Sequence, residues 1–412
     1  MAHPVIGSIL RKRVSTGHLT VLWEDGSAET FGDGAGSEVR VRVSDKAVRE
    51  IVRKQGLGLG EAYMSGDLSF ERGDIAGLLA MVGPNPIGPR ARPGLIGRGW
   101  RSLLRLKRQW NDRRASRANV HHHYDLSYDL YRSFLDADMQ YSCAYFPKPG
   151  MTLDEAQAAK KAHIIAKLRL AQDQRVLDIG CGWGGLGLQL AADHGVRVTG
   201  VTLSGEQLAV ARRRAAESRL EDRAQFALAD YRDLTGPFDR IVSVGMFEHV
   251  GAPNYRAFFE KIRGLLTDDG VAVIHSIGRM DGPGVTDPFI RKYIFPGGYV
   301  PALSQVTTAV EQAGLWITDI EVLRLHYAET LRHWRERFLA ARETIAGVYD
   351  QRFCRMWEVY LAASEMGFRH AGLFVFQIQL TRRVDTVPVV RDYMVECEAS
   401  LDRRPAPIRR SG

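Results

Sequence analysis

The sequence predicts an α/β protein in which a smaller N-terminal α+β domain precedes a doubly wound, Rossmann-like parallel sheet. Short β-branched runs alternate with helical periods over the larger part of the chain, and a glycine-rich turn follows the first of these runs. The 412 residues are 45% hydrophobic and 25% charged, which excludes collagen-like, coiled-coil and wholly disordered proteins. This length corresponds to about two to three domains.

The N-terminal part, residues 1–83, carries signals for a hairpin and two helices. Apolar runs at 18–23 and 28–31 flank an Asp-Gly dipeptide, which is typical of tight hairpin turns. Ser44 is a typical N-cap for the helical stretch KAVREIVRK, and DIAGLLAMV predicts a second helix. These elements predict a small α+β domain without a visible acid–base cluster.

Six strand-like runs predict the sheet of the larger domain, which is expected over residues 119–395. Each run is short and rich in β-branched residues, as in a parallel sheet that is buried on both faces. Residues 330–368 are expected to be mostly helical, and a basic tail is expected over 396–412. The six runs are 175–179, 196–201, 225–229, 240–246, 271–277 and 372–380.

The net charge of +8 is concentrated in one segment, since ten basic residues and one acidic residue lie between Arg90 and Arg117. The surrounding Pro/Gly-rich stretch, 84–118, is typical of a linker. Tryptophan and leucine residues among its arginines indicate a basic amphipathic helix on an anionic membrane surface. A solvated linker helix docked on the larger domain fits equally well. Nucleic acid is a third partner class, although no reader motif is present.

The cysteine spacing and the hydropathy of the sequence argue against several further classes of protein. The four cysteines lack CxxC spacing, which argues against a disulfide framework or structural zinc and favours a reducing cytosol. No run of 18 or more uncharged apolar residues occurs, and the first residues do not resemble a secretory signal. The consecutive His121, His122 and His123 cannot readily converge on one ion, so no metal site is expected.

The glycine-rich turn VLDIGCGWGG is the strongest binding signal in the sequence. Its glycines fit the dinucleotide pattern GxGxxG, but that class needs an acid at the end of the next strand, which here ends in Val-Thr-Leu-Ser. Asp178, Gly180, Gly182 and Gly184 instead give the Asp-x-Gly-x-Gly-x-Gly pattern of S-adenosylmethionine (SAM) methyltransferases. A helix N-terminus suits the methionine carboxylate of SAM, and a carboxylate suits its ammonium. A tight turn without a ligand is the alternative.

Six motifs follow one another in order within residues 119 to 385. They are HYDLSYDLYRSFLDADMQYSCAYF (123–146), VLDIGCGWGG (176–185), VTGVTLSGEQ (198–207), DYRDL (230–234), FDRIVSVGMFEHVG (238–251) and IRKYIFPGG (290–298). Together they closely resemble the motifs of cyclopropane-fatty-acyl-phospholipid synthases and the related mycolic acid cyclopropane synthases. The N-terminal domain resembles, more loosely, the sterol-carrier-like lipid-carrier domain of bacterial members. The resemblance implies a SAM methyltransferase fold with an antiparallel last strand.

The resemblance also implies an enzyme, a cyclopropane-fatty-acyl-phospholipid synthase. Such an enzyme transfers a methylene from SAM onto the cis double bond of unsaturated acyl chains in membrane phospholipids, through a carbocation and with bound bicarbonate as the base. The residues implied for the bicarbonate shell are Cys143, Glu248, His275, Ile277 and Tyr327. The residues implied for SAM are Tyr141, Ser142, Asp178, Gly180, Gly182, Gly184, Thr202, Gln207, Tyr231 and Arg232. The aromatic residues expected around a water-free alkene cavity are Tyr145, Phe146, Tyr293, Phe295 and Tyr299.

Several of these residues also have a purely structural interpretation. Cys143 could be a small buried apolar residue, His275 a satisfied core histidine, and Glu248 a helix cap. Ser364 is a departure from the family pattern, because many relatives have a cysteine near this position. The implied mechanism needs no covalent nucleophile, so we expect that cysteine to be dispensable.

The implied partners are an unsaturated phospholipid at an anionic membrane surface and a second copy of the chain in a homodimer, with no nucleic acid. The implied location is the cytoplasm, peripherally associated with the inner face of the membrane. Three alternatives remain open. One is a SAM enzyme that makes methylene- or methyl-branched acyl chains or methylates an amine. The others are a non-catalytic lipid-binding protein and a nucleic-acid methyltransferase.

Overall fold

The structure is a computed structural model that describes residues 3–54, 56–83 and 127–402. The chain groups into two compact units. The first contains the N-terminal residues together with 285–298 and 327–373, and the second contains the other described residues.

Three predicted features lie outside the described residues: the linker with its amphipathic helix up to residue 118, the three consecutive histidines, and the tail from residue 403. Among the described residues, no helix is long and apolar enough to cross a membrane.

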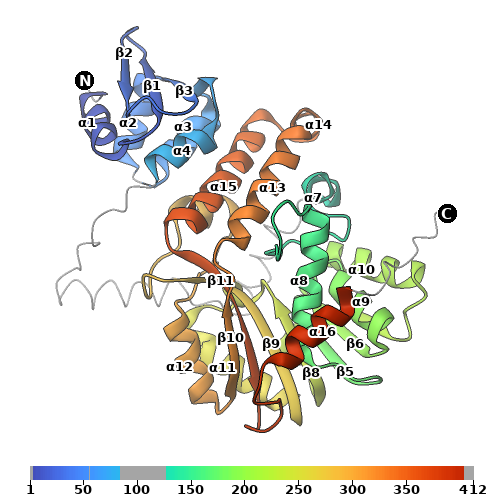
Figure 1. Ribbon diagram of the computed structural model, residues 1–412. Helices are drawn as coiled ribbons and strands as arrows, with labels where there is room; N and C mark the ends of the chain where they lie inside the picture. The colour runs from blue at the N-terminus through green and yellow to red at the C-terminus, as the bar shows by residue number, and fades with distance from the viewer. Residues whose placement is uncertain (1–2, 55, 84–126, 403–412) are drawn as a thin grey trace. The chain divides into compact units, whose positions relative to one another are not determined.

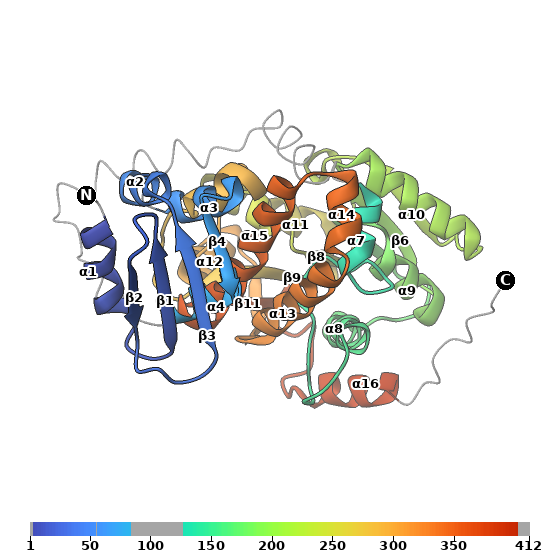
Figure 2. The same ribbon diagram turned by 90° about the horizontal axis from the view of Figure 1, so that it is seen from above.

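The first unit has a four-stranded sheet of β1 (His18–Trp23), β2 (Ala28–Phe31), β3 (Glu38–Val43) and β4 (Leu68–Arg72). The strands lie side by side in the order β2-β1-β3-β4 (Figure 2). The predicted hairpin is present, since β1 and β2 pair antiparallel and Gly26 has a φ of 84° in the turn. β3 pairs parallel with β1 and antiparallel with β4.

The helices of the first unit are α1 (His3–Arg13), α2 (Asp45–Arg53), α3 (Gly58–Ser65), α4 (Ile75–Val82), α13 (His326–Ala340), α14 (Arg342–Val348) and α15 (Gln351–His370), with the short turn η4 (Ile290–Ile294). Side chains cap the predicted helices. Ser44 Oγ accepts the backbone N–H of Ala47 at 3.1 Å, and Asp74 accepts that of Gly77 at 2.8 Å. These bonds satisfy donors that have no partner within the helix.

Helix α15 joins the later segments of the first unit to its N-terminal residues, because it packs against α3 and α4. The buried Glu358 on α15 accepts a hydrogen bond from the hydroxyl of Tyr63, and Arg342 Nε donates to its other oxygen at 2.6 Å. Burying a carboxylate is costly, and pairing of this kind offsets the cost. The two later segments therefore belong to the N-terminal unit, whereas the sequence suggested one domain over residues 119–395.

The second unit has a sheet of seven strands, β5 (Arg175–Ile179), β6 (Arg197–Thr202), β7 (Ala224–Leu228), β8 (Phe238–Val244), β9 (Leu266–Arg279), β10 (Trp316–Val322) and β11 (Leu373–Thr381). Their order is β10-β11-β9-β8-β5-β6-β7. β5 pairs parallel with both β6 and β8, and β10 runs antiparallel to β11. The strand order reverses between β5 and β8, and ligands of open α/β sheets bind at such a point.

The helices of the second unit are α7 (Tyr128–Phe134), α8 (Leu153–Leu168), α9 (Gly185–His194), α10 (Gly205–Glu217), α11 (Tyr255–Leu265), α12 (Leu303–Ala313) and α16 (Asp392–Asp402), with short turns η1 (Tyr231–Asp233), η2 (Phe247–His249) and η3 (Ala252–Asn254). Helices α8, α9 and α10 lie on one face of the sheet, and α11 and α12 lie on the other (Figure 1). Each face buries its own hydrophobic cluster, one around Phe258 and one around Phe226.

The predicted fold class is confirmed, and all six predicted strands are present with small shifts of their ends. β10 is a seventh strand that the sequence did not reveal. Its residues are mostly half-buried or exposed, and only Asp319 is buried. This segment therefore lacks the continuous apolar run that marks the other strands.

Candidate SAM and anion sites

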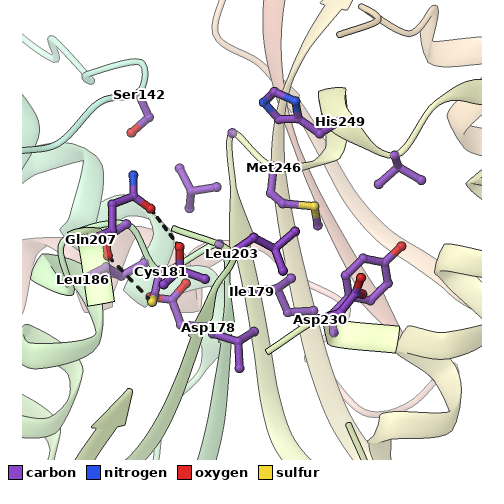
Figure 3. Close-up of a pocket in the computed structure, with 18 of the residues that line it drawn as sticks. Ser142, Asp178, Ile179, Cys181, Leu186, Leu203, Gln207, Asp230, Met246 and His249 are labelled. Atoms are coloured by element: carbon purple, nitrogen blue, oxygen red, sulfur yellow. Dashed lines mark hydrogen bonds between the residues drawn. The ribbon is translucent and has the colours of Figure 1, made fainter. Parts of the chain in front are cut away.

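A pocket of about 230 Å³ opens at the carboxyl ends of β5, β6, β7 and β8, next to the reversal in strand order (Figure 3). Nine of the ten residues that the sequence assigned to SAM line it. They are Tyr141, Ser142, Asp178, Gly180, Gly182, Thr202, Gln207, Tyr231 and Arg232. The exception is Gly184, which lies outside the lining.

The loop after β5 needs glycine because its backbone is left-handed at three positions. Gly180, Gly182 and Gly184 have φ values of 82°, 54° and 81°, which residues with a Cβ rarely adopt. The backbone N–H of Gly180 donates to the carbonyl of Val201 at 2.9 Å, so β6 holds the loop in place. No described atom outside its immediate chain neighbours lies within 4 Å of a Cβ built on Gly182, which leaves the backbone open to a ligand.

Gly184 packs against neighbouring side chains and does not line the pocket. It is the N-cap of α9, and a Cβ there would lie 3.0 Å from both Ala211 and Phe226. We expect Gly184→Ala to destabilise the fold by about 1–3 kcal/mol, through strain at positive φ and crowding. Chemical unfolding measures this directly. Gly264→Ala is the control, since this helical glycine has open space around it and should gain stability. An unchanged unfolding midpoint for Gly184→Ala would contradict the packing role.

The pocket contains a buried carboxylate and a neutral histidine. Asp178 is 2% exposed, and its Oδ2 accepts no hydrogen bond from any described residue. Burial raises the pKa of Asp178 to about 7, against the opposing positive charge of Lys160. Burial lowers the pKa of His249 to about 4, so its imidazole is neutral near pH 7. A buried carboxylate oxygen with no hydrogen-bond partner among the described residues, in a pocket whose histidine is uncharged, suits a cation. SAM carries two cationic groups, an ammonium and a sulfonium.

Two further walls of the pocket come from the ends of β6 and β7. Thr202 Oγ1 donates to Gln207 Oε1 at 2.8 Å, which brings these two predicted residues together. After β7, the ring of Tyr231 packs edge-on against Phe258, with centroids 5.4 Å apart. The Arg232 side chain is paired with the buried Asp230, to which its Nε donates at 2.9 Å. The guanidinium is therefore anchored rather than free to follow a ligand.

Helix α8 supports the pocket wall that carries Tyr141 and Ser142. Gln157 Nε2 donates to the carbonyl of Ser142 at 2.9 Å. Lys160 Nζ donates to Ser142 Oγ at 2.8 Å and to Gln140 Oε1 at 2.7 Å. Both side chains are buried behind this wall.

The residues predicted for an anion site include a second buried carboxylate. Glu248 Oε1 accepts the backbone N–H of Ile277 at 2.7 Å, while its Oε2 has no hydrogen-bond partner among the described residues. Burial raises the pKa of Glu248 to about 7, and the bond from Ile277 opposes this rise. Glu248 and Ile277 are therefore in direct contact. The backbone N–H of Ile277 donates to the carboxylate of Glu248.

His275 lies two residues before Ile277 on β9 and is held by a chain of buried polar groups. Burial lowers the pKa of His275 well below its usual value, so the ring is neutral. Lys167 Nζ, which can only donate, binds Gln377 Oε1 at 2.7 Å. This bond turns Gln377 Nε2 toward His275 Nδ1, at 3.2 Å. Because the amide nitrogen donates, Nδ1 accepts and the proton of the neutral ring resides on Nε2.

Cys143 and Tyr327, the other two residues predicted for the anion site, have contacts of their own. Cys143 is buried, and its Sγ lies 3.2 Å from the carbonyl of Ala144. Tyr327 belongs to the first unit, where its ring contacts Trp334 and Phe368 at centroid distances of 5.7 and 4.8 Å.

The aromatic residues expected around the alkene are also divided between the two units. Tyr145, Phe146 and Tyr299 belong to the second unit, and Tyr293 and Phe295 belong to the first. Among the described residues, no group of three or more His, Cys, Asp or Glu side chains could hold a metal ion.

Several residues of these sites were not predicted. Asp230 and His249 line the pocket, Lys160 supports it, and Gln377 holds His275. The sequence contained a signal for Gln377, since a polar residue in the apolar run FVFQIQL must find a hydrogen-bond partner when the strand is buried. Asp230 and His249 are direct neighbours of predicted residues within the quoted motifs.

The family model for mycolic acid cyclopropane synthetase matches residues 111–378, which include the whole pocket and the buried Glu248. This chain belongs to that family. It is therefore an enzyme of a SAM-dependent methyltransferase family. A second model, for a domain of unknown function named DUF7884, matches residues 7–85.

Curated relatives of this family member extend over most of the chain. The cyclopropane-fatty-acyl-phospholipid synthase of Escherichia coli (strain K12) is 39% identical over 85% of this chain and 89% of its own length. The tuberculostearic acid methyltransferase UfaA1 of Mycobacterium tuberculosis is 37% identical over 92% of this chain and 91% of its own length.

Solved structures agree with this membership. Mycolic acid cyclopropane synthase CmaA1, complexed with SAH and CTAB, aligns with a TM-score of 0.61 and 35% identity. The alignment covers 64% of this chain and 97% of CmaA1. Cyclopropane synthase MmaA2 from Mycobacterium tuberculosis also has a TM-score of 0.61, at 34% identity, with the same coverage.

Proposed function

We propose that this enzyme forms cyclopropane rings in the unsaturated acyl chains of membrane phospholipids, using SAM as the methyl donor. The observation that carries the proposal is the buried Glu248, whose Oε1 is fixed by Ile277 and whose Oε2 has no partner among the described residues. Such an acceptor suits ring closure, because a proton must leave a carbocation in a site without water.

The residues that line the pocket would hold SAM. The chemistry that SAM supplies is an electrophilic methyl group on a sulfonium. Asp178 would hold its ammonium, and the neutral His249 adds no positive charge to the pocket. The glycine backbone at Gly180 and Gly182 would lie against the ligand, and Thr202 and Gln207 would bind from the end of β6. Tyr231 would offer a ring face or edge to the adenine.

Glu248 and His275 would hold the anion. The chemistry that a bound bicarbonate supplies is acceptance of the proton lost on ring closure. Glu248 Oε2 would accept a hydrogen bond from a protonated oxygen of that ion, and His275 would donate from Nε2, the nitrogen that carries its proton. Cys143 and Tyr327 are assigned to this shell by the family resemblance alone.

The proposed partner is an anionic membrane surface, reached through the basic segment between Arg90 and Arg117. We also propose peripheral attachment at the cytoplasmic face and a homodimer, as the family resemblance suggests. Replacing Arg101, Arg105, Lys107 and Arg108 by glutamine should weaken binding to anionic vesicles by about 1 kcal/mol for each charge removed. SAM affinity should stay unchanged. Equal vesicle binding by the variant and the wild type would mean that the segment is only a linker.

Product analysis tests the proposed reaction. The purified protein is incubated with SAM and vesicles of a phospholipid with cis-monounsaturated chains, and the released acyl chains are examined by mass spectrometry and proton NMR. One added CH₂ with upfield cyclopropane protons is the expected result. No added carbon, with SAM binding established separately, would contradict a lipid substrate.

A second product class is favoured by one specific observation. The relative named as a tuberculostearic acid methyltransferase is nearly as similar as the E. coli synthase and covers more of this chain. The same experiment separates the two, because a methylene-branched product would show vinylic protons and a methyl-branched product would show neither vinylic nor cyclopropane protons.

A further inference from the structure

Lys160 is a buried charged residue that the proposed mechanism does not use. It lies on α8, is 1% exposed, and is not among the described residues that line the pocket. Burying an ammonium is costly unless nearby groups compensate for its charge. Burial lowers the pKa of Lys160 to about 8, and Asp136 opposes this effect. The position of Lys160 behind the pocket wall therefore calls for a role.

We propose that Lys160 is a positioning residue of the SAM site, which acts through the hydroxyl of Ser142 and the carboxylate of Asp178. This role depends on SAM binding in the pocket, as argued above. It requires no contact between Lys160 and SAM itself.

Lys160 orients the hydroxyl of Ser142 through a hydrogen bond. An ammonium has only donors, so Ser142 Oγ accepts from Lys160 at 2.8 Å. The hydroxyl proton of Ser142 is then left to donate to another group, and Ser142 lines the pocket. Lys160 also donates to Gln140 Oε1 at 2.7 Å, and Gln140 Nε2 donates to Asp138 at 3.0 Å, which locks this wall. A fixed donor on a residue that lines the pocket suits an anionic group such as the carboxylate of SAM.

Lys160 also acts on Asp178 through its positive charge. Burial favours the neutral form of Asp178, and the charge of Lys160 opposes that effect. Lys160 therefore keeps more of Asp178 ionised, which is the form that attracts the ammonium of SAM. The titratable groups that interact with Lys160 are Asp136, Asp138, Cys143, Lys161, Asp178 and His275.

The test is SAM binding to Lys160→Met, measured by calorimetry as a function of pH. We expect an affinity about tenfold or more below that of the wild type near neutral pH, because one donor and one charge are lost. We also expect the pH below which SAM binding weakens to move upward, because Asp178 loses its neighbouring cation. A folded Lys160→Met with wild-type affinity and wild-type pH dependence would overturn the proposal.

Lys167→Met is the matched control. Lys167 lies on the same helix, is also 1% exposed, and binds Gln377, which does not line the pocket. Its loss should destabilise the fold but leave SAM affinity within about twofold. A comparable loss of SAM affinity in both variants would indicate a general effect of removing a buried lysine and would also overturn the proposal.

A double-mutant cycle with Ser142→Ala tests whether Lys160 acts through Ser142. The two effects on SAM affinity should be less than additive, since coupled residues share one interaction. If Lys160→Met does not fold, Ser142→Ala alone remains informative: its affinity should fall while its pH dependence stays that of the wild type. Unchanged affinity would overturn the proposal. A wild-type protein that binds no SAM at all would instead contradict the proposed function, so the two failures are distinguishable.

Discussion

Glu248→Gln is expected to lower turnover by at least about 10²-fold while SAM binds with an affinity within about threefold of the wild type. The amide keeps an oxygen that can accept the N–H of Ile277, so the local fold is preserved. The other oxygen, Oε2, is an acceptor with no partner in the described part of the chain, and the substitution replaces it by an NH₂ donor. A protonated oxygen of a bound anion would then face a donor instead of an acceptor, and the proton acceptor of the reaction would lose its orientation.

The control is Glu260→Gln on α11, where the same change is made at an exposed carboxylate paired with Arg256. It should leave both turnover and SAM affinity unchanged. Turnover is measured by the release of S-adenosylhomocysteine and SAM affinity by calorimetry. Glu248→Gln with more than about a tenth of wild-type turnover would remove Glu248 from the mechanism.

The sequence predicted the sheet of the second unit well because each buried strand is a continuous apolar run. β10 was missed because it lies at the edge of the sheet and is mostly half-buried, so its residues alternate in character. The grouping of 327–373 with the N-terminal unit was also missed. It depends on contacts such as Tyr63 with Glu358, which join residues that are distant in the chain, and no local pattern reveals such a pair.

Nine of the ten residues predicted for SAM line the pocket, because they lie in compact motifs at the ends of strands. Lys160 was not predicted, because its helix is capped and patterned like any other, and only the structure shows that its ammonium is bonded to Ser142. Gly184 shows what a glycine pattern in a sequence does not reveal. A glycine pattern cannot distinguish a position that lies against a ligand from one that packs against Phe226.

Asp178→Asn is expected to weaken SAM binding by about 10- to 100-fold near neutral pH and to remove its pH dependence. A hydrogen bond to a charged group contributes about 1.5–3 kcal/mol, which corresponds to this range. In the wild-type protein, burial raises the pKa of Asp178 to about 7. Only the ionised carboxylate pairs with the ammonium, so SAM affinity should rise with pH through about 7 and fall by up to about tenfold per unit below it.

The direction of this pH dependence separates Asp178 from its neighbours in the pocket. His249, with a pKa of about 4, stays neutral through the measured range and adds no titration of its own. Titrations between about pH 5.5 and about pH 7.5 keep an α-amino group such as that of SAM mostly protonated. Asp233→Asn, at an exposed carboxylate of η1, is the matched control and should keep the wild-type profile. An Asp178→Asn variant that retains the wild-type rise in affinity would place the titrating group elsewhere, and the ammonium of SAM would then need a different partner.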